Sequence, residues 1–256
     1  LLLTSAAVFS GISAAEDTAY FYVNSETGDD GANGKSAASA VKTLAHAYEL
    51  AHNGGTIVIT NAYEISATVY EIEHPGAPFV ITTRDAKTDY GAAGAKLVFG
   101  KALRYVMKGD TTFENMNFNA LGTNLLVVAQ HHKVTVGEGV KITGDRAKLT
   151  GDTVARSFCI LGGYQSGQSS PPAAGDLDTD ITVLSGSKIY IVAFSRSLKG
   201  PYTGTARIRI GGTADVSTLH LTSRLPGRRE GRHDRGGDYR QCQSRQHLRH
   251  HAEHHD

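Results

Sequence analysis

Tryptophan, cysteine and proline are the residue types that this sequence has little of. Its 256 residues include no Trp, two Cys and six Pro. Two cysteines, Cys159 and Cys242, do not make a disulfide framework, so a small fold held together by several disulfides is excluded. The scarcity of proline contrasts with 29 glycines. Many glycines, few prolines and many β-branched residues are typical of an all-β protein with tight turns.

Long apolar runs are also missing, apart from one at the N-terminus. The run LLLTSAAVFSGISAA is too short to cross a bilayer as a helix. Because Ser13 and Ala15 fit the −3 and −1 positions of a signal-peptidase site, residues 1–15 are interpreted as a truncated signal peptide. The alternative is a buried N-terminal strand or helix. The first interpretation predicts a secreted or cell-surface protein whose mature chain has no membrane span.

The last part of the chain, residues 223–256, differs in composition from the rest. From Arg224 onward there is no Val, Ile or Phe. Eight arginines and five acidic residues give this segment a net charge of +3. Since the whole sequence has a net charge of +1, the chain before this segment carries −2 and is mildly acidic. A basic segment of this kind does not by itself indicate nucleic-acid binding, and we expect no nucleic-acid partner.

Three interpretations of this tail stay open. It is a histidine-rich metal-binding tract with His250, His251, His254 and His255 as ligands, a disordered basic arm, or the product of a frameshift. Consecutive His codons read one nucleotide later encode Thr or Ile, so a shifted frame from Asp238 onward resumes a sequence rich in β-forming residues. We favour the frameshift. As printed, the tail buries too little apolar surface to offset its ordering entropy, which predicts disorder.

The stretch from Tyr22 to Ile65 organises the chain. An extended start leads into the loop NSETGDDGANG, a short amphipathic helix over residues 41–51, and the β-branched strand TIVIT after Gly54 and Gly55. In the helix, the spacing of Val41, Leu44, Ala45 and Tyr48 predicts one buried face. Asp29 and Asp30 in the loop are interpreted as turn residues, with contact to a cation as the alternative.

Short extended runs separated by turn residues occupy the chain after this stretch. Most have three to six residues, which is typical of an all-β solenoid, sandwich or barrel. ITVLSGSKIYIVAF, from Ile181 to Phe194, can be laid over IRIGGTADVSTLHL, from Ile208 to Leu221, at a period of 27 residues. This repetition favours a solenoid, whose first coil needs a cover, and the helix supplies one. In TTFENMNF, Phe113, Met116 and Phe118 are the expected inward residues.

These motifs carry a resemblance to a known superfamily. YVNSETGDDGANG, AVKTLAHAYELA and GGTIVITNAYEI, together with the later phrase TTFENMNFNA, resemble the right-handed parallel β-helix proteins of the pectin-lyase-like superfamily. The Gly-rich later coils look like those of bacterial surface repeat proteins. The resemblance covers residues 20 to 222 and implies an all-β, right-handed parallel β-helix over residues 16–222 with a short N-terminal capping α-helix. It does not imply an activity, since members include lyases, hydrolases and adhesins.

One group of acidic residues is a candidate for binding a metal ion or for catalysis. Asp176, Asp178 and Asp180 alternate in GDLDTDITV and would share a face of a strand, where three carboxylates suit Ca²⁺. Calcium is therefore the one cofactor considered, and a solvated acidic loop is the alternative. At the 27-residue offset, Arg207 lies over Asp180. The resemblance implies that a lyase would combine such a cluster with a basic residue, for which the candidates are Lys188, Arg196 and Arg207. The alternative is a surface ion-pair ladder.

The function expected from the sequence is a non-catalytic one. We expect a monomeric, secreted or cell-surface module that serves in adhesion or contacts a polysaccharide or a host or cell-surface glycan, since the long side of a solenoid suits extended partners. Tyr164 and Tyr202, in loops, are candidates for stacking on sugar rings. The alternative is a polysaccharide lyase or glycoside hydrolase that acts on an acidic polysaccharide.

Overall fold

The computed structural model describes residues 19–67, 69–71, 78–100, 103–120, 125–144, 158–164, 175–176, 178–186, 188–193, 202–203 and 205–220. Within them the chain is mostly β, with a 3₁₀ turn at Ala37–Ser39 and one α-helix, α1, at Leu44–Leu50. The strands form three large sheets and a two-stranded one, in which β14 (Gly175–Asp176) pairs with β17 (Tyr202–Thr203). All recorded strand pairings are parallel.

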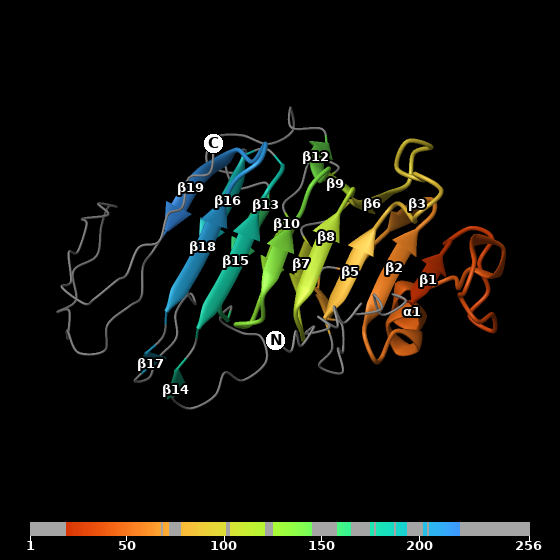
Figure 1. Cartoon of the computed structure of the whole chain (residues 1–256), viewed down its shortest axis with the longest axis horizontal. Helices are drawn as coiled ribbons and strands as arrows, with labels where there is room; N and C mark the ends of the chain where they lie inside the picture. Colours follow the sequence, from red (N-terminus) through yellow and green to blue (C-terminus); the bar gives the residue numbers. More distant parts are fainter. Residues whose placement is uncertain are drawn as a thin grey trace, which may run out of the picture.

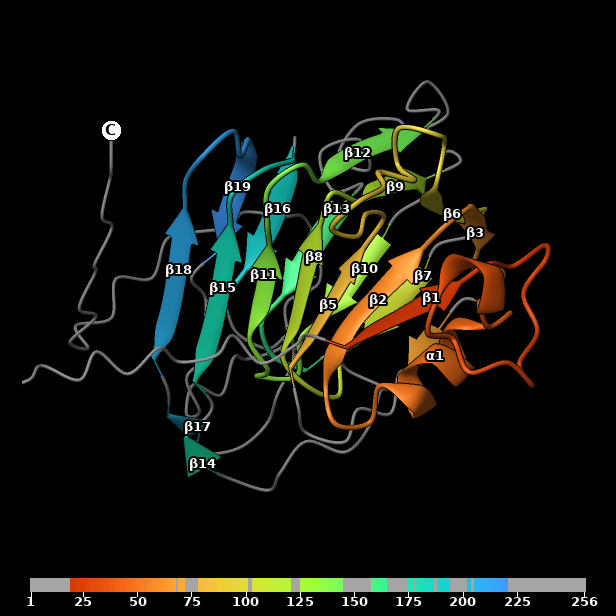
Figure 2. The ribbon, with the colours of Figure 1, turned by 45° about the vertical axis from the view of Figure 1, so that its right-hand side comes forward.

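The three large sheets stack their strands in chain order (Figures 1 and 2). The seven-stranded sheet contains β1 (Tyr20–Val23), β2 (Gly55–Ile59), β5 (Phe79–Thr82), β8 (Thr111–Glu114), β11 (Val134–Val136), β15 (Thr179–Val183) and β18 (Ala206–Ile210). The six-stranded sheet contains β4 (Val69–Glu71), β7 (Leu103–Val106), β10 (Leu125–Val128), β13 (Phe158–Leu161), β16 (Ile189–Val192) and β19 (Val216–His220). The four-stranded sheet contains β3 (Ala62–Glu64), β6 (Lys96–Phe99), β9 (Asn117–Ala120) and β12 (Lys141–Gly144).

Each circuit of the chain visits the sheets in turn and then pairs with the circuit before it. Because strands of one sheet come from successive circuits, the fold is a parallel β-helix, and this prediction from the sequence is confirmed. The 27-residue repeat is confirmed too: Ile181 pairs with Ile208, and Ile189 with Val216. After Ile189 the register shifts by one, so Tyr190 faces Thr218, because β19 carries an extra residue there.

The core consists of inward-facing side chains, which the strand register aligns in rows from one coil to the next. In the seven-stranded sheet, one row passes in register through Phe21, Ile57, Ile81, Phe113, Val136 and Val183, all buried. Aromatic side chains fill the middle: Phe113 lies edge-on to Phe118 with ring centroids 5.2 Å apart, and Phe118 lies 5.2 Å from Phe158. The expected inward positions of Phe113, Met116 and Phe118 are therefore confirmed.

The N-terminal end of the stack is closed by β1 and α1, which lie together at one end of the molecule (Figure 2). Helix α1 begins after Thr43, whose hydroxyl accepts a hydrogen bond from the His46 N–H. Its buried face is Leu44, Ala47 and Tyr48. The predicted face was wrong in including Ala45, which is exposed, because the helix starts at Leu44 and the buried Val41 belongs to an extended segment bridged to Val23.

The acidic loop before α1 is structural, as predicted. The Asp30 carboxylate accepts hydrogen bonds from the N–H groups of Lys42 and Thr43 and from the Thr43 hydroxyl, at 2.8 to 2.9 Å. Asp29 accepts one from the Gly31 N–H. Gly28 is required there, since a Cβ would lie 2.3 Å from the Val41 carbonyl oxygen. This loop therefore fixes the chain segment that leads into the cap.

Candidate functional site

The outer side of the seven-stranded sheet carries a row of mostly hydroxyl-bearing side chains. The strand register aligns, from one end to the other, Tyr20, Thr56, Val80, Thr112, Thr135, Thr182 and Arg209. Neighbouring members of such a row are separated by about 4.8 Å, the spacing of paired strands. The row therefore runs along the axis of the β-helix. Thr56 within it is buried, and its other members are partly or fully exposed.

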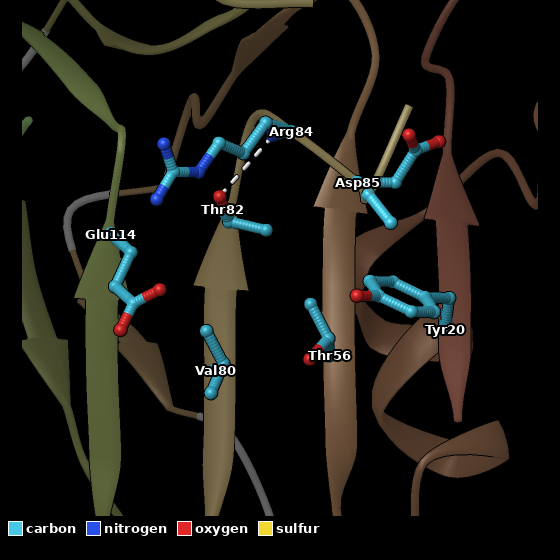
Figure 3. A pocket seen from close by; sticks show the side chains of 8 residues that line it. Tyr20, Thr56, Val80, Thr82, Arg84, Asp85 and Glu114 are labelled. Carbon is cyan, nitrogen blue, oxygen red and sulfur yellow. Dashed lines mark hydrogen bonds between the residues drawn. The ribbon is translucent and has the colours of Figure 1, made fainter. Parts of the chain in front are cut away.

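A groove opens where this row meets the N-terminal coils. It has a volume of about 530 Å³ and is lined by Tyr20, Thr56, Val80, Thr82, Arg84, Asp85, Ala86 and Glu114. Figure 3 shows the Tyr20 ring beside Thr56, and the Arg84 side chain extending across the end of β5 towards β8, from which Glu114 projects. The groove thus brings together an aromatic ring, a guanidinium and a carboxylate above the buried Thr56 and Thr82.

Asp85 is held in place at the edge of the groove by four donors. Its carboxylate accepts hydrogen bonds from the Lys87 and Thr88 N–H groups, both at 2.7 Å, and from the hydroxyls of Tyr22, at 2.8 Å, and Tyr90, at 3.3 Å. Burial alone would raise the pKa of Asp85, but these hydrogen bonds outweigh it and hold the pKa below its ordinary value. Burial and the Asp85 carboxylate together raise the pKa of Tyr22.

We expect acid to weaken this corner. Since the folded-state pKa of Asp85 is lowered, its carboxylate contributes stability at neutral pH that is lost as the pH falls below about 4. The Asp85→Asn variant is therefore expected to lose less thermal stability than the unmodified protein between about pH 6 and pH 3. Glu64→Gln, which changes an exposed carboxylate on β3, is the control. Parallel melting curves for Asp85→Asn and the unmodified protein would contradict the assignment.

The structure brings two of the sequence-predicted acidic residues next to arginines. Asp180 is in register with Arg207 and Thr182 with Arg209, as the 27-residue offset predicted. The ion pairs are diagonal: Arg207 lies 3.5 Å from the Asp178 carboxylate, and Arg209 lies 2.9 Å from that of Asp180. The Asp178 carboxylate also accepts a 2.8 Å hydrogen bond from the Thr205 N–H. These contacts form an ion-pair ladder between two coils.

Of the other predicted site residues, Lys188 does not join this ladder. Lys188 is exposed on the turn before β16, in the six-stranded sheet, and its backbone N–H donates to the Asp215 carboxylate at 3.3 Å. Arg196 and the side chain of Asp176 lie outside the described residues, so the calcium interpretation stays a prediction. Among the side chains that the structure describes, no three from His, Cys, Asp and Glu come together as a metal site.

Sequence reasoning missed the groove residues and chose other tyrosines. The Tyr164 ring lies 5.4 Å from the ring of His131, at the turn that follows β10, and the side chain of Tyr202 is not among those described. The signal that was available is the alternation of the strands. Val80 stands between the buried Phe79 and Ile81. Tyr20 adjoins the buried Phe21, and Glu114 adjoins the buried Phe113. The register that gathers them follows from the stacking of four coils, which no single segment reveals.

The fold defines the class of this protein as a parallel β-solenoid. No protein-family model, no curated protein sequence and no solved structure matches the chain. Within the described residues, no helix has the length and apolar character needed to cross a membrane.

Proposed function

We propose that the protein is a monomeric, secreted or cell-surface β-helix module, of the pectin-lyase-like type, that contacts glycans and does not cleave them. The observation that carries the proposal is the open groove on the outer side of the seven-stranded sheet, continued by the hydroxyl row along the axis. An extended polysaccharide lying along this row would meet one coil after another. Such a face suits repetitive, extended partners.

The chemistry of the groove favours a sugar chain over other ligands. The Tyr20 ring offers an apolar face with a polar edge, which suits the mixed surface of a sugar ring. Glu114 offers a carboxylate as a partner for sugar hydroxyls, whereas Thr56 and Thr82, which also line the groove, are buried at 6% and 4% exposure. Arg84 offers a planar guanidinium that can hold a carboxylate by two hydrogen bonds. A uronate-containing chain uses all three kinds of group.

Binding to a panel of polysaccharides tests the proposal. We expect an acidic polymer such as polygalacturonate or alginate to bind more tightly than neutral dextran, measured by calorimetry or affinity electrophoresis. Tyr20→Ala is expected to weaken binding about tenfold, the effect of ~1.4 kcal/mol, while Tyr20→Phe retains it. Arg84→Gln should weaken binding of the acidic polymer and reduce its salt dependence.

Arg104→Gln is the matched control for Arg84→Gln. Arg104 is an exposed arginine on β7, in the six-stranded sheet, and lines no part of the groove. Its substitution removes the same charge and should leave glycan binding unchanged. Equal losses in Arg84→Gln and Arg104→Gln would mean that net charge alone governs binding, and the absence of binding to every polymer would overturn the proposal.

A polysaccharide lyase or glycoside hydrolase is the second candidate, because Asp178 and Arg207 lie within 3.5 Å of each other. Non-catalytic contact is favoured over it for a chemical reason. An arginine side chain keeps its proton at neutral pH and is therefore a poor general base for abstracting a proton from a sugar. An assay for unsaturated uronate and for new reducing ends separates the two, since a turnover that is lost in Arg207→Gln would establish the enzyme.

A further inference from the structure

The two ends of the β-helix differ in how they are closed. At the N-terminal end, α1 and β1 cover the first coil, and Phe21 is 4% exposed. At the other end, β18 and β19 are the last strands in the order of their sheets (Figure 1). The two exposed large hydrophobic residues in the described part of the chain both lie there: Ile210, 38% exposed, and Leu219, 41% exposed.

Both residues occupy inward positions of their sheets. Ile210 is in register with Val183 in the preceding coil, and Leu219 with Ile191, and both of these are 0% exposed. Ile208 and Val216, the other inward residues of the last coil, are partly buried and pack against the core. The core rows therefore continue into this coil, and no element among the described residues covers its far side.

The positive charges on β18 also restrict which strand can pair with its open edge. Arg207 and Arg209 stand on its outer side, with about half of each side chain exposed. If two copies of the chain met end to end about a two-fold axis, their β18 strands would pair antiparallel. Centred on Ile208, that pairing sets each Arg207 opposite an Arg209, and like charges in directly opposed positions are destabilising. A strand with carboxylates at its outward positions is favoured, as Asp180 on β15 and Asp178 just before it already show.

We propose that this end is an interface for a further coil of the same chain, stacked in parallel on β18 and β19, with aliphatic residues over Ile210 and Leu219 and acidic residues beside the two arginines. Residues 224–256 as printed contain no Val, Ile or Phe and only two Leu, so their composition lacks the aliphatic residues that such a coil needs. We expect this coil to be encoded in the frame that is read one nucleotide later than the printed tail, where consecutive histidine codons become Thr or Ile codons.

The nucleotide sequence of the gene is the first test. We expect a single-base insertion or deletion near the codon of Arg224, beyond which the other frame encodes short alternating strands with Gly or Asn turns. A verified gene that encodes the printed tail, with no such frame, overturns the proposal.

The second test is hydrogen exchange measured on two full-length proteins. One has the printed tail, and the other, the frame-restored chain, has the tail encoded in the other reading frame. In the frame-restored chain, the amides of β18 and β19 are expected to exchange at least tenfold more slowly than in the chain with the printed tail, because the edge is paired and covered. Ile210→Asp should reverse this protection in the restored chain. Thr213→Asp, in the exposed turn between the two strands, is the control and should not. Equal exchange in the two chains contradicts a stacked coil.

Sedimentation velocity distinguishes between the two ways of covering this end, by a further coil of the same chain or by a second copy of the chain. The frame-restored chain is expected to be monomeric at all concentrations. A dimer of the restored chain that Ile210→Asp dissociates would show that the end pairs with another molecule, and the proposal would then be wrong.

Discussion

Replacing Phe113 by alanine is expected to lower the free energy of unfolding by about 3 to 5 kcal/mol, the usual cost of truncating a buried aromatic ring. Phe113 is 0% exposed and lies in the row between Ile81 and Val136. Its ring also contacts those of Tyr105 and Phe118, with centroids 6.0 and 5.2 Å away. The cavity would open between rings of opposite sheets, where the rigid strand ladders leave little room for collapse.

Urea unfolding followed by circular dichroism measures this loss. Thr112→Ala is the matched control, because Thr112 is the neighbouring residue on β8, points to the outer side and is only partly buried. Its substitution is expected to change the free energy of unfolding by less than about 1 kcal/mol. Because each coil of a solenoid contacts only its neighbours, Phe113→Ala is also expected to reduce the cooperativity of unfolding. Equal effects of the two substitutions would contradict the assigned core row.

The parts of this fold that could be predicted from the sequence are those set by local patterns. The strands Phe79–Thr82, Lys96–Phe99 and Leu125–Val128 lie where their β-branched and apolar residues placed them. The 27-residue offset also placed Arg207 over Asp180. The ion pairs nevertheless formed on the diagonal, because long side chains reach positions two residues along the neighbouring strand.

The groove could not be predicted because it depends on contacts between coils. Tyr20 and Glu114 are 94 residues apart in the printed sequence and come together only through the pairings of β1, β2, β5 and β8. Contacts between distant segments also explain why Ala45 was wrongly predicted to lie on the buried face of the helix. A helical face was assigned from spacing alone, whereas the packing of Val41 as an extended residue beside Val23 moves the start of the helix to Leu44.

Replacing Tyr48 by alanine is expected to have the second large effect, a loss of about 3 to 5 kcal/mol, since it detaches the cap from the core. Tyr48 is one of the residues by which α1 contacts the first coils: its ring lies 5.3 Å from that of Phe79, and its hydroxyl lies 2.6 Å from the Tyr105 hydroxyl. Both hydroxyls are buried, and burial raises the pKa of each, so the pair is uncharged.

The hydroxyl contribution can be separated from that of the ring. Tyr48→Phe leaves the Tyr105 hydroxyl buried without this partner and is expected to cost about 1 to 3 kcal/mol. Adding Tyr105→Phe removes both hydroxyls, so the double variant is expected to be more stable than Tyr48→Phe alone, since no unpaired polar group remains. Thermal unfolding of the four proteins in this cycle gives the coupling energy. If the two single losses simply add in the double variant, the hydroxyl pair does not link the cap to the coils.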